Sequence, residues 1–238
     1  MRLPKALAFD VFGTVVDWRS GVARAAAPVL AALGRADIDP DAFADGWRAK
    51  YQPAMAAVRS GARPFVILDI LHRETLEELL RDLGIDPQAV GEQGLAELTH
   101  AWHRLDPWPD AVAGLTRLKA RFPIVTLSNG NIALMLDMAR RAGLPWDAIL
   151  GAEVSGHYKP DPEAYLATAR ALAVEPGDLC LVAAHHSDLA AARAAGLLAA
   201  YVDRPLEYGG RPAPDARFAA DWEWRADSLT DLAAMLGA

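Results

Sequence analysis

Residues 6–14 read ALAFDVFGT, and this stretch decides the fold class. An apolar run leads to Asp10, and Gly13 and Thr14 follow it at a turn. A short apolar run that ends at turn residues is typical of a strand buried on both faces. The sequence therefore predicts a buried strand that carries the carboxylate of Asp10 at its carboxyl end.

Further runs of the same kind occur at residues 122–127, 178–184 and 197–202. Helical patterns, for example at residues 132–142 and 162–172, separate them. Strands that alternate with helices form a parallel sheet, and ligands bind beyond the carboxyl ends of its strands. Polar residues follow these runs, so we predict one shared site at that edge of the sheet.

The segment between the first two predicted strands is almost wholly helical in pattern. Its helical stretches are residues 21–33, 40–57, 64–83 and 88–102. A helical block inserted at this place is predicted to form a cap over the active edge of the sheet. We expect a core domain of residues 1–16 and 105–238 and a cap domain of residues 17–104.

Composition narrows the class of protein. The chain has 238 residues, 53% hydrophobic, and a formal net charge of -7 with scattered basic residues. Nucleic acid is therefore not expected as a partner, because a phosphate backbone requires a concentrated basic face.

Cys180, in an apolar run, is predicted to be a core residue and not a nucleophile. With no signal peptide and no apolar run long enough for a bilayer, no membrane association is expected and a cytoplasmic location is predicted.

Polar residues at the predicted strand ends are candidates for chemistry, each with a plainer alternative. Asp10 is a nucleophile or a residue that caps the next turn. Ser128, where a helix is expected to begin, is an anion seat or a helix N-cap. Lys159, in a loop held by two prolines, is a site cation or a surface lysine. Asp188, at the start of the next helix, is a catalytic carboxylate or a partner of the helix dipole.

These residues lie in motifs with a fixed order. The motifs are residues 9–14, FDVFGT; residues 127–129, LSN; residues 159–162, KPDP; and Asp188. Over essentially the whole chain they resemble the haloacid dehalogenase superfamily. The resemblance implies an α/β fold, with a Rossmann-like parallel-sheet core and an inserted, mainly helical cap domain, and it implies that Asp10 is a covalent nucleophile.

Two departures separate this chain from the phosphatases that dominate the superfamily. Phosphatases have a second aspartate two residues after the nucleophile as a general acid, and this chain has Phe12 there. They bind magnesium through an acidic fourth motif, where residues 183–188 read AAHHSD with one carboxylate. A site so poor in hard oxygen ligands suits a leaving group that needs no proton, such as a halide. The chain is thus similar to the 2-haloacid dehalogenase branch (type II), and no metal or other cofactor is expected.

The resemblance assigns roles to further residues. Residues 46–51, GWRAKY, are similar to the cap helix that supplies an arginine to the departing halide. This gives the role to Arg48, with Lys50 or Arg59 as alternative cations. Thr14 is expected to hydrogen-bond the nucleophile. The expected substrate-binding residues are Val11, Phe12, Ser128, Asn129, Tyr165 and His185, with Trp18, Tyr51 and Phe65 of the cap as lining residues at most.

His185 is a further departure, this time within the branch. Better-known members have Ser-Ser-Asn before the last aspartate, and Ala183 and His185 occupy the first and third of these positions. We interpret His185 as a donor that replaces the asparagine, since a protonated imidazole suits a small, hard anion. This motivates the hypothesis of a subgroup acting on haloacetates, including fluoroacetate. The alternative is that His185 marks a different substrate.

The predicted reaction is hydrolysis of small 2-haloalkanoic acids to 2-hydroxy acids through an aspartyl ester, with inversion where C2 is chiral. Lys159 would keep Asp10 ionised, and Asp188 would activate the water. Three alternatives stay open: a magnesium-dependent phosphatase acting on a small phosphate ester, an enzyme that attacks another carbon electrophile, and a non-catalytic binding protein of this fold. The partners expected are the haloacid and halide, and the resemblance suggests a homodimer.

Overall fold

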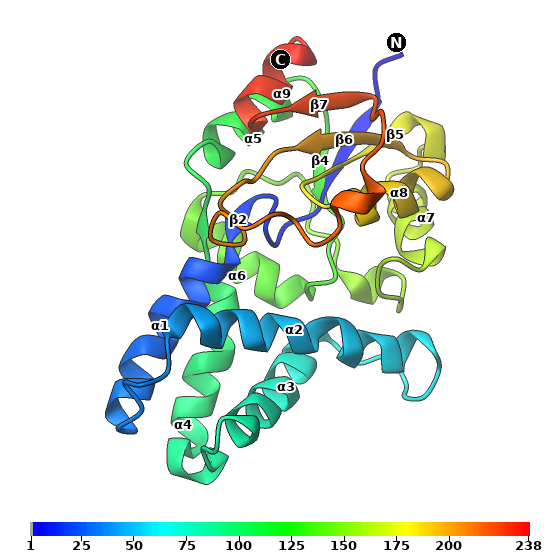
Figure 1. Cartoon of the computed structure of the whole chain (residues 1–238). Coiled ribbons are helices and arrows are strands. Elements are labelled where there is room, and N and C mark those ends of the chain that lie inside the picture. The colour runs from blue at the N-terminus through cyan, green and yellow to red at the C-terminus, as the bar shows by residue number, and fades with distance from the viewer. Residues whose placement is uncertain (1) are drawn as a thin grey trace. The chain divides into compact units, whose positions relative to one another are not determined.

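The computed structural model describes residues 2–238, and within them five strands form one parallel sheet in the order β4-β1-β5-β6-β7 (Figure 1). The strands are β1 Ala6–Phe9, β4 Ile124–Thr126, β5 Leu179–Ala183, β6 Leu198–Val202 and β7 Trp224–Ala226. Strand β1 pairs with β4 on one side and with β5 on the other. Asp10 therefore follows an interior strand of the sheet, and the predicted parallel α/β fold is confirmed.

Helices surround this sheet. They are α5 Ala111–Lys119, α6 Ile132–Ala142, α7 Pro162–Ala171, α8 His186–Ala194 and α9 Leu229–Met235, with short 3-10 turns η2 Ala152–Val154, η3 Pro176–Asp178 and η4 Ala216–Phe218. Because side chains alternate along a strand, Ala8 and Leu181 point to one face, where they form a buried cluster with Tyr165 of α7 and Leu189 of α8. Helices α5 and α9 pack against each other and contact β4 and β7, respectively. The sheet is thus a rigid base for the loops at its carboxyl edge.

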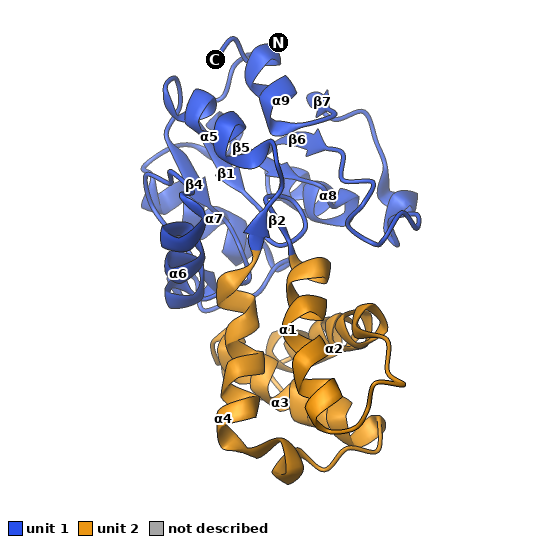
Figure 2. Cartoon of the chain, turned by 90° about the vertical axis from the view of Figure 1, so that its left-hand side faces the viewer, with its two compact units in different colours: residues 1–17, 106–238 blue, residues 18–105 orange. Residues whose placement is uncertain are grey.

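Contacts along the chain divide it into two compact units, residues 1–17 with 106–238 and residues 18–105 (Figure 2). The second unit is the helical cap. Its helices are α1 Trp18–Ala32, α2 Pro40–Arg59, α3 Leu68–Asp82 and α4 Pro87–Thr99, followed by η1 His100–Arg104. In the first unit, β2 Val16–Asp17 pairs antiparallel with β3 Asp106–Pro107, so the two segments that lead into and out of the cap lie side by side.

Local sequence explains the ends of the cap helices. Asp39 and Asp86 each accept a backbone N–H at the start of α2 and α4, and a proline follows each of them at the first helical position. Gly91 interrupts α4 at φ 72°, a left-handed conformation that a glycine adopts without strain. The expected helix over residues 88–102 is therefore kinked, and it ends as a 3-10 turn.

Other bounds also differ from the sequence prediction. The expected helix at residues 64–83 begins only at Leu68, while α1 begins at Trp18, before the predicted residue 21. The sequence analysis did not predict α5, β7 or α9. Strand β7 has three residues with an exposed arginine in the middle, so it lacks the apolar run that marks the other strands. Among the described residues, no helix is both long and apolar enough to cross a membrane.

Candidate active site

Asp10 is the first residue after β1 at the carboxyl edge of the sheet. Its side chain is buried at 9% exposure, and its backbone N–H donates to the Val182 carbonyl oxygen at 3.0 Å, which extends the pairing with β5. The chain then turns at Gly13, whose φ of 86° favours glycine. This turn brings Thr14 back toward the carboxylate.

Three side chains donate to the Asp10 carboxylate. The Thr14 hydroxyl donates to Oδ2 at 2.7 Å and the Lys159 ammonium to Oδ1 at 2.9 Å, while His185 Nδ1 lies 3.2 Å from Oδ2. Burial alone would raise the pKa of Asp10, but the charge of Lys159 and the hydrogen bond from His185 hold that pKa well below its ordinary value. Asp10 is therefore an ionised carboxylate in a dry environment, as a nucleophile requires.

Lys159 joins the two catalytic aspartates of the sequence prediction. Its Nζ donates to Asp10 Oδ1 at 2.9 Å and to Asp188 Oδ2 at 2.5 Å, and all three side chains are at most 10% exposed. Burial lowers the pKa of Lys159, but the charges of the two carboxylates more than offset it and raise that pKa above its ordinary value. Lys159 is thus a buried cation and not a surface lysine.

The backbone of Lys159 is held by Asn129, which follows β4. Asn129 Oδ1 accepts the Lys159 N–H at 2.7 Å, and Nδ2 lies 3.5 Å from the Lys159 carbonyl oxygen. This positioning contact was not predicted from the sequence, where Asn129 was assigned only to the halide side.

Asp188 lies in the first turn of α8 and uses both carboxylate oxygens. Oδ2 accepts from Lys159, and Oδ1 accepts from the Tyr165 hydroxyl at 2.6 Å. Burial, together with the charge of Asp188, raises the pKa of Tyr165, so the phenol stays protonated and remains a donor. Tyr165 therefore contacts Asp188, although the sequence analysis assigned it to the substrate.

Ser128, Val11 and Phe12 lie in the loops beside the nucleophile and are buried. Ser128 Oγ accepts the Gly130 N–H at 3.1 Å. The helix predicted over residues 132–142 is α6, but Ser128 lies four residues before its first residue, so Ser128 does not cap it and shapes the preceding loop instead. The Phe12 ring packs against Gly130, where a Cβ atom would lie 3.1 Å from the ring.

His185 and its neighbour His186 have different partners. His185 Nε2 lies 2.9 Å from Oε1 of Glu207, whose side chain is 3% exposed, while its Nδ1 faces Asp10. His186 Nδ1 accepts from the Trp222 indole N–H at 3.0 Å. The two imidazoles diverge, so they do not form a shared metal site.

Glu207 was missed by the sequence analysis. It lies five residues after β6, in a loop with few features of its own. The signal that points to it is the rule that functional residues follow the carboxyl ends of parallel strands, applied to the loop after Val202.

Arg204 holds the backbone of the turn at Thr14. Arg204 Nε donates to the Thr14 carbonyl oxygen at 2.8 Å, and its two Nη atoms donate to the Asp110 carboxylate at 2.8 and 3.0 Å. The Thr14 hydroxyl also accepts the Ala184 N–H at 2.9 Å, while its own proton goes to Asp10. Donor and nucleophile are therefore held in one arrangement.

Comparison with known proteins agrees with this geometry. The model of the family described as haloacid dehalogenase-like hydrolase matches residues 4–196. The chain belongs to this hydrolase family. A crystal structure of a defluorinating L-2-haloacid dehalogenase is similar to it at 52% identity and a TM-score of 0.95, covering 100% of this chain and 96% of that one. The predicted superfamily and its 2-haloacid dehalogenase branch are thus confirmed.

Curated relatives include two activities. An (S)-2-haloacid dehalogenase of Xanthobacter autotrophicus is 30% identical over 202 residues, which cover 84% of this chain and 75% of the relative. A phosphoglycolate phosphatase of Chromobacterium violaceum is 30% identical over 203 residues, which cover 82% and 83%. Distinguishing halide from phosphate chemistry therefore depends on the residues of the site.

The magnesium ion of phosphatases in this superfamily would require free carboxylate oxygens. Here both oxygens of Asp188 accept from Lys159 and Tyr165, and Asp10 Oδ2 accepts from Thr14 and His185. A magnesium ion at these residues would lie against the Lys159 ammonium, which already bridges the two carboxylates. The donor set does not fit magnesium, which prefers several free oxygen ligands.

In the cap of this dehalogenase-like hydrolase, Arg48 of α2 lies in a cluster of aromatic rings. Its Cζ is 4.1 Å from the ring centroid of Tyr51 and 5.4 Å from that of Trp18. His72 stacks on Trp102 at 4.3 Å between centroids, and burial lowers its pKa to about 3. The cluster thus carries the positive charge of Arg48, whereas His72 is neutral near pH 7.

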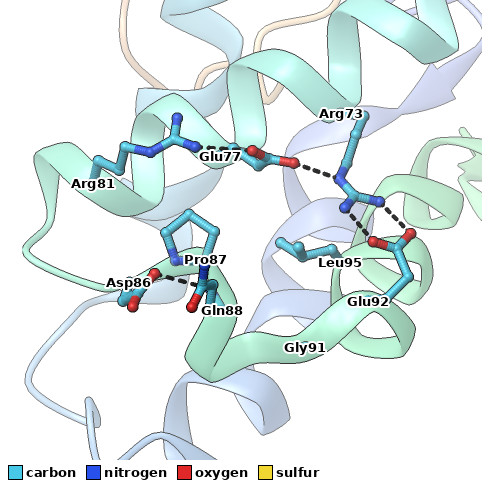
Figure 3. A pocket seen from close by; sticks show the side chains of 9 residues that line it. All are labelled: Arg73, Glu77, Arg81, Asp86, Pro87, Gln88, Gly91, Glu92 and Leu95. Carbon is cyan, nitrogen blue, oxygen red and sulfur yellow. Dashed lines mark hydrogen bonds and ion pairs between the residues drawn. The ribbon is translucent and has the colours of Figure 1, made fainter.

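Lys50 of the cap is engaged with two carboxylates. Lys50 Nζ, an alternative cation for halide, donates to Glu78 at 2.8 Å and to Asp82 at 2.6 Å. A hollow on the cap is lined by paired charges: Arg73 binds Glu77 and Glu92 (Figure 3). Because these groups satisfy one another, this hollow contributes no candidate for catalysis.

Proposed function

We propose that this enzyme hydrolyses small 2-haloalkanoic acids to 2-hydroxy acids through a covalent ester on Asp10. The observation that carries the proposal is the Lys159 ammonium, which bridges Asp10 at 2.9 Å and Asp188 at 2.5 Å. One cation thereby keeps the nucleophile ionised and places the second carboxylate beside it. The names of the 2-haloacid dehalogenases similar to this chain support the same substrate class.

In the first step, Asp10 attacks C2 of the substrate from the side opposite the halogen. A carboxylate oxygen forms a bond to C2, and the halide leaves with the electrons of the carbon–halogen bond. Ser128 and neighbouring backbone N–H groups would hold the substrate carboxylate. The resemblance gives the halide to Arg48, and the aromatic rings around Arg48 support this role because they limit its hydration.

In the second step, water attacks the carbonyl carbon of the aspartyl ester. Asp188 would orient this water and accept its proton, and Tyr165 and Lys159 hold Asp188 in place. Breaking the acyl carbon–oxygen bond releases the 2-hydroxy acid and restores Asp10. The configuration at C2 is inverted, since only the first step changes a bond to that atom.

Fluoroacetate belongs to the proposed substrate range. Fluoride is a poor leaving group, and both ring nitrogens of His185 face carboxylates, Asp10 and Glu207, so this range does not rest on a contact from His185 to the halide. The word "defluorinating" in the description of the 52% identical enzyme supports this range.

The second candidate is a phosphatase, which the similarity to phosphoglycolate phosphatase favours. Against it, Phe12 replaces the general acid, and the oxygens that would bind magnesium accept from Lys159, Tyr165, Thr14 and His185.

The test is halide release from chloroacetate and fluoroacetate after treatment with EDTA, with Asp10→Asn as the control. Release that survives chelation and disappears in Asp10→Asn supports covalent, metal-free dehalogenation. A single turnover in water labelled with the heavy oxygen isotope should place the label in Asp10 and not in the product. Magnesium-dependent hydrolysis of p-nitrophenyl phosphate without any halide release would overturn the proposal in favour of the phosphatase.

A further inference from the structure

We propose that Glu207 is a positioning residue that holds His185 as a donor to the carbonyl oxygen of the Asp10 ester while water attacks it. This inference rests on the proposed function and deepens its second step. It concerns residues of the first unit alone, and it gives a role to a buried carboxylate that the mechanism above leaves unused.

The geometry around His185 requires two donating ring nitrogens. Nδ1 lies 3.2 Å from Asp10 Oδ2, and Nε2 lies 2.9 Å from Glu207 Oε1. A neutral imidazole has one N–H, so one of its nitrogens would then point a lone pair at a carboxylate oxygen. The protonated ring satisfies both contacts. Burial opposes that charge, but Glu207 and Asp10 outweigh burial and raise the pKa of His185 well above its ordinary value.

Gly13 makes room for this pair. A Cβ atom at Gly13 would overlap the Glu207 carboxylate, and the φ of 86° at Gly13 already favours glycine. The turn after the nucleophile and the loop after β6 therefore fit together only with glycine at this position. Glu207 is 3% exposed, so it is screened little by water and holds His185 in one place.

The donors divide the two oxygens of Asp10 into different roles. Oδ1 receives Lys159 alone, whereas Oδ2 receives both Thr14 and His185. An oxygen with two donors has its lone pairs occupied, so Oδ1 is the better nucleophile. Once Oδ1 is alkylated, Oδ2 becomes the carbonyl oxygen of the ester. Thr14 and His185 are then already in place as the donors of an oxyanion hole.

Charge balance supports the same division. Lys159 with Asp188 and His185 with Glu207 are two pairs, each neutral without Asp10. When Asp10 becomes a neutral ester, neither pair is left with an uncompensated buried charge. The negative charge that develops on Oδ2 during water attack then faces the positive member of the second pair.

The step balances as follows in atoms and electrons. The water oxygen bonds to Cγ of Asp10, its proton passes to Asp188, and the carbonyl electron pair moves to Oδ2. The pair then returns, the bond from Cγ to Oδ1 breaks, and the departing oxygen takes the proton from Asp188. The product is the 2-hydroxy acid, and the second proton of the water is released to solvent from the regenerated carboxylic acid.

The experiment compares Glu207→Gln with the wild type on chloroacetate, with halide followed in the first turnover and in the steady state. Glutamine preserves the size of the side chain and removes the charge that keeps His185 protonated. We expect a burst of one chloride per site and a steady-state rate about 10²–10³-fold lower, the usual loss for one oxyanion donor. Mass spectrometry should detect Asp10 carrying a carboxymethyl group.

Two further variants distinguish a positioning role of Glu207 from a general loss of stability. In His185→Asn, adding Glu207→Gln should give no further loss in ester hydrolysis, because Glu207 acts through His185. Asp178→Asn is the matched control, since Asp178 is a buried carboxylate paired with Lys5 at 2.8 Å at the start of β5. It should accumulate no ester even if it is less stable.

The pH profile of ester hydrolysis provides a readout that a structural role would not move. Asp10 and Glu207 face the His185 ring directly, and Lys159 and Asp188 lie on the other side of Asp10. In the wild type the rate should fall at alkaline pH as His185 loses its proton, and in Glu207→Gln this alkaline fall should move to lower pH. Wild-type activity without ester accumulation in Glu207→Gln would overturn this inference alone. Absence of halide release from the wild type would overturn the proposed function itself.

Discussion

Replacing Lys159 by methionine tests how strongly one buried cation holds the site together. The side chains of Lys159, Asp10 and Asp188 are at most 10% exposed, and Nζ lies 2.9 and 2.5 Å from the two carboxylates. At an effective dielectric of about 20, Coulomb's law gives an attraction of about 6 kcal/mol for each contact. The desolvation of three charges offsets much of this attraction. Removing one partner of such a buried pair typically costs about 3–5 kcal/mol, because the remaining charges stay buried.

We therefore expect Lys159→Met to lower the free energy of unfolding by about 3–5 kcal/mol at pH 7, measured by urea denaturation. The pKa of Asp10 is lowered in the folded state, so its contribution is present above the ordinary aspartate value of 3.8 and is lost as the pH falls toward the folded value. The difference between wild type and variant should narrow below that pH. Dehalogenation should be lost, since Asp10 and Asp188 both depend on Lys159.

Lys50→Met is the matched control, because Lys50 also lies between two carboxylates. Glu78 and Asp82 are each 61% exposed, so the solvent screens this arrangement and its loss should cost less than about 1 kcal/mol. Adding Asp10→Asn to Lys159→Met should recover part of the lost stability by removing an uncompensated charge. Equal small losses for Lys159→Met and Lys50→Met would refute the reasoning.

Three further predictions concern the same edge of the sheet. Tyr165→Phe removes a donor to the Asp188 carboxylate. Because a hydrogen bond to a charged group contributes about 1.5–3 kcal/mol, ester hydrolysis should slow by about 10- to 100-fold in single-turnover kinetics. An unchanged rate would contradict this role of Tyr165. Gly13→Ala should displace Glu207, lower the melting temperature and accumulate ester, and normal turnover would show that the turn tolerates a side chain. The folded pKa of His185 lies above 6.5, so its contribution to stability is complete below 6.5 and is lost as pH rises through the folded value. The difference in unfolding free energy between wild type and His185→Asn should therefore narrow at alkaline pH, and a difference that grows there would contradict the assignment.

The centre of the fold was predictable because its physical signals are local. The apolar run before Asp10 and the later runs of the same kind identify buried parallel strands without knowledge of their neighbours. The rule about carboxyl ends placed Asp10 and Asp188 in one region, the family resemblance added Lys159, and the structure brings these three side chains together. Strand β7 gives no such signal, since it pairs only along β6 at the edge of the sheet.

The finer contacts of the site depend on folded loops and were not predictable. The contact between Glu207 and His185 joins positions 22 residues apart across β6, and Asn129 binds the backbone of Lys159 across 30 residues. No spacing rule relates such positions, because the lengths and turns of the loops decide which groups meet. Ser128 shows the same limit, since it lies in the loop before α6 and does not cap that helix.

The hydrogen bonds of Arg204 link the turn at Thr14, which follows the nucleophile Asp10, to the last part of the chain. Arg204 holds Thr14 and Asp110, and the same Asp110 carboxylate accepts the Leu229 N–H at 2.7 Å where α9 begins. The match to the family model ends at residue 196, before both Arg204 and Glu207. Transient unfolding at the start of α9 should therefore also release the turn that contains Thr14. The amide hydrogens of these two regions should then exchange with solvent together.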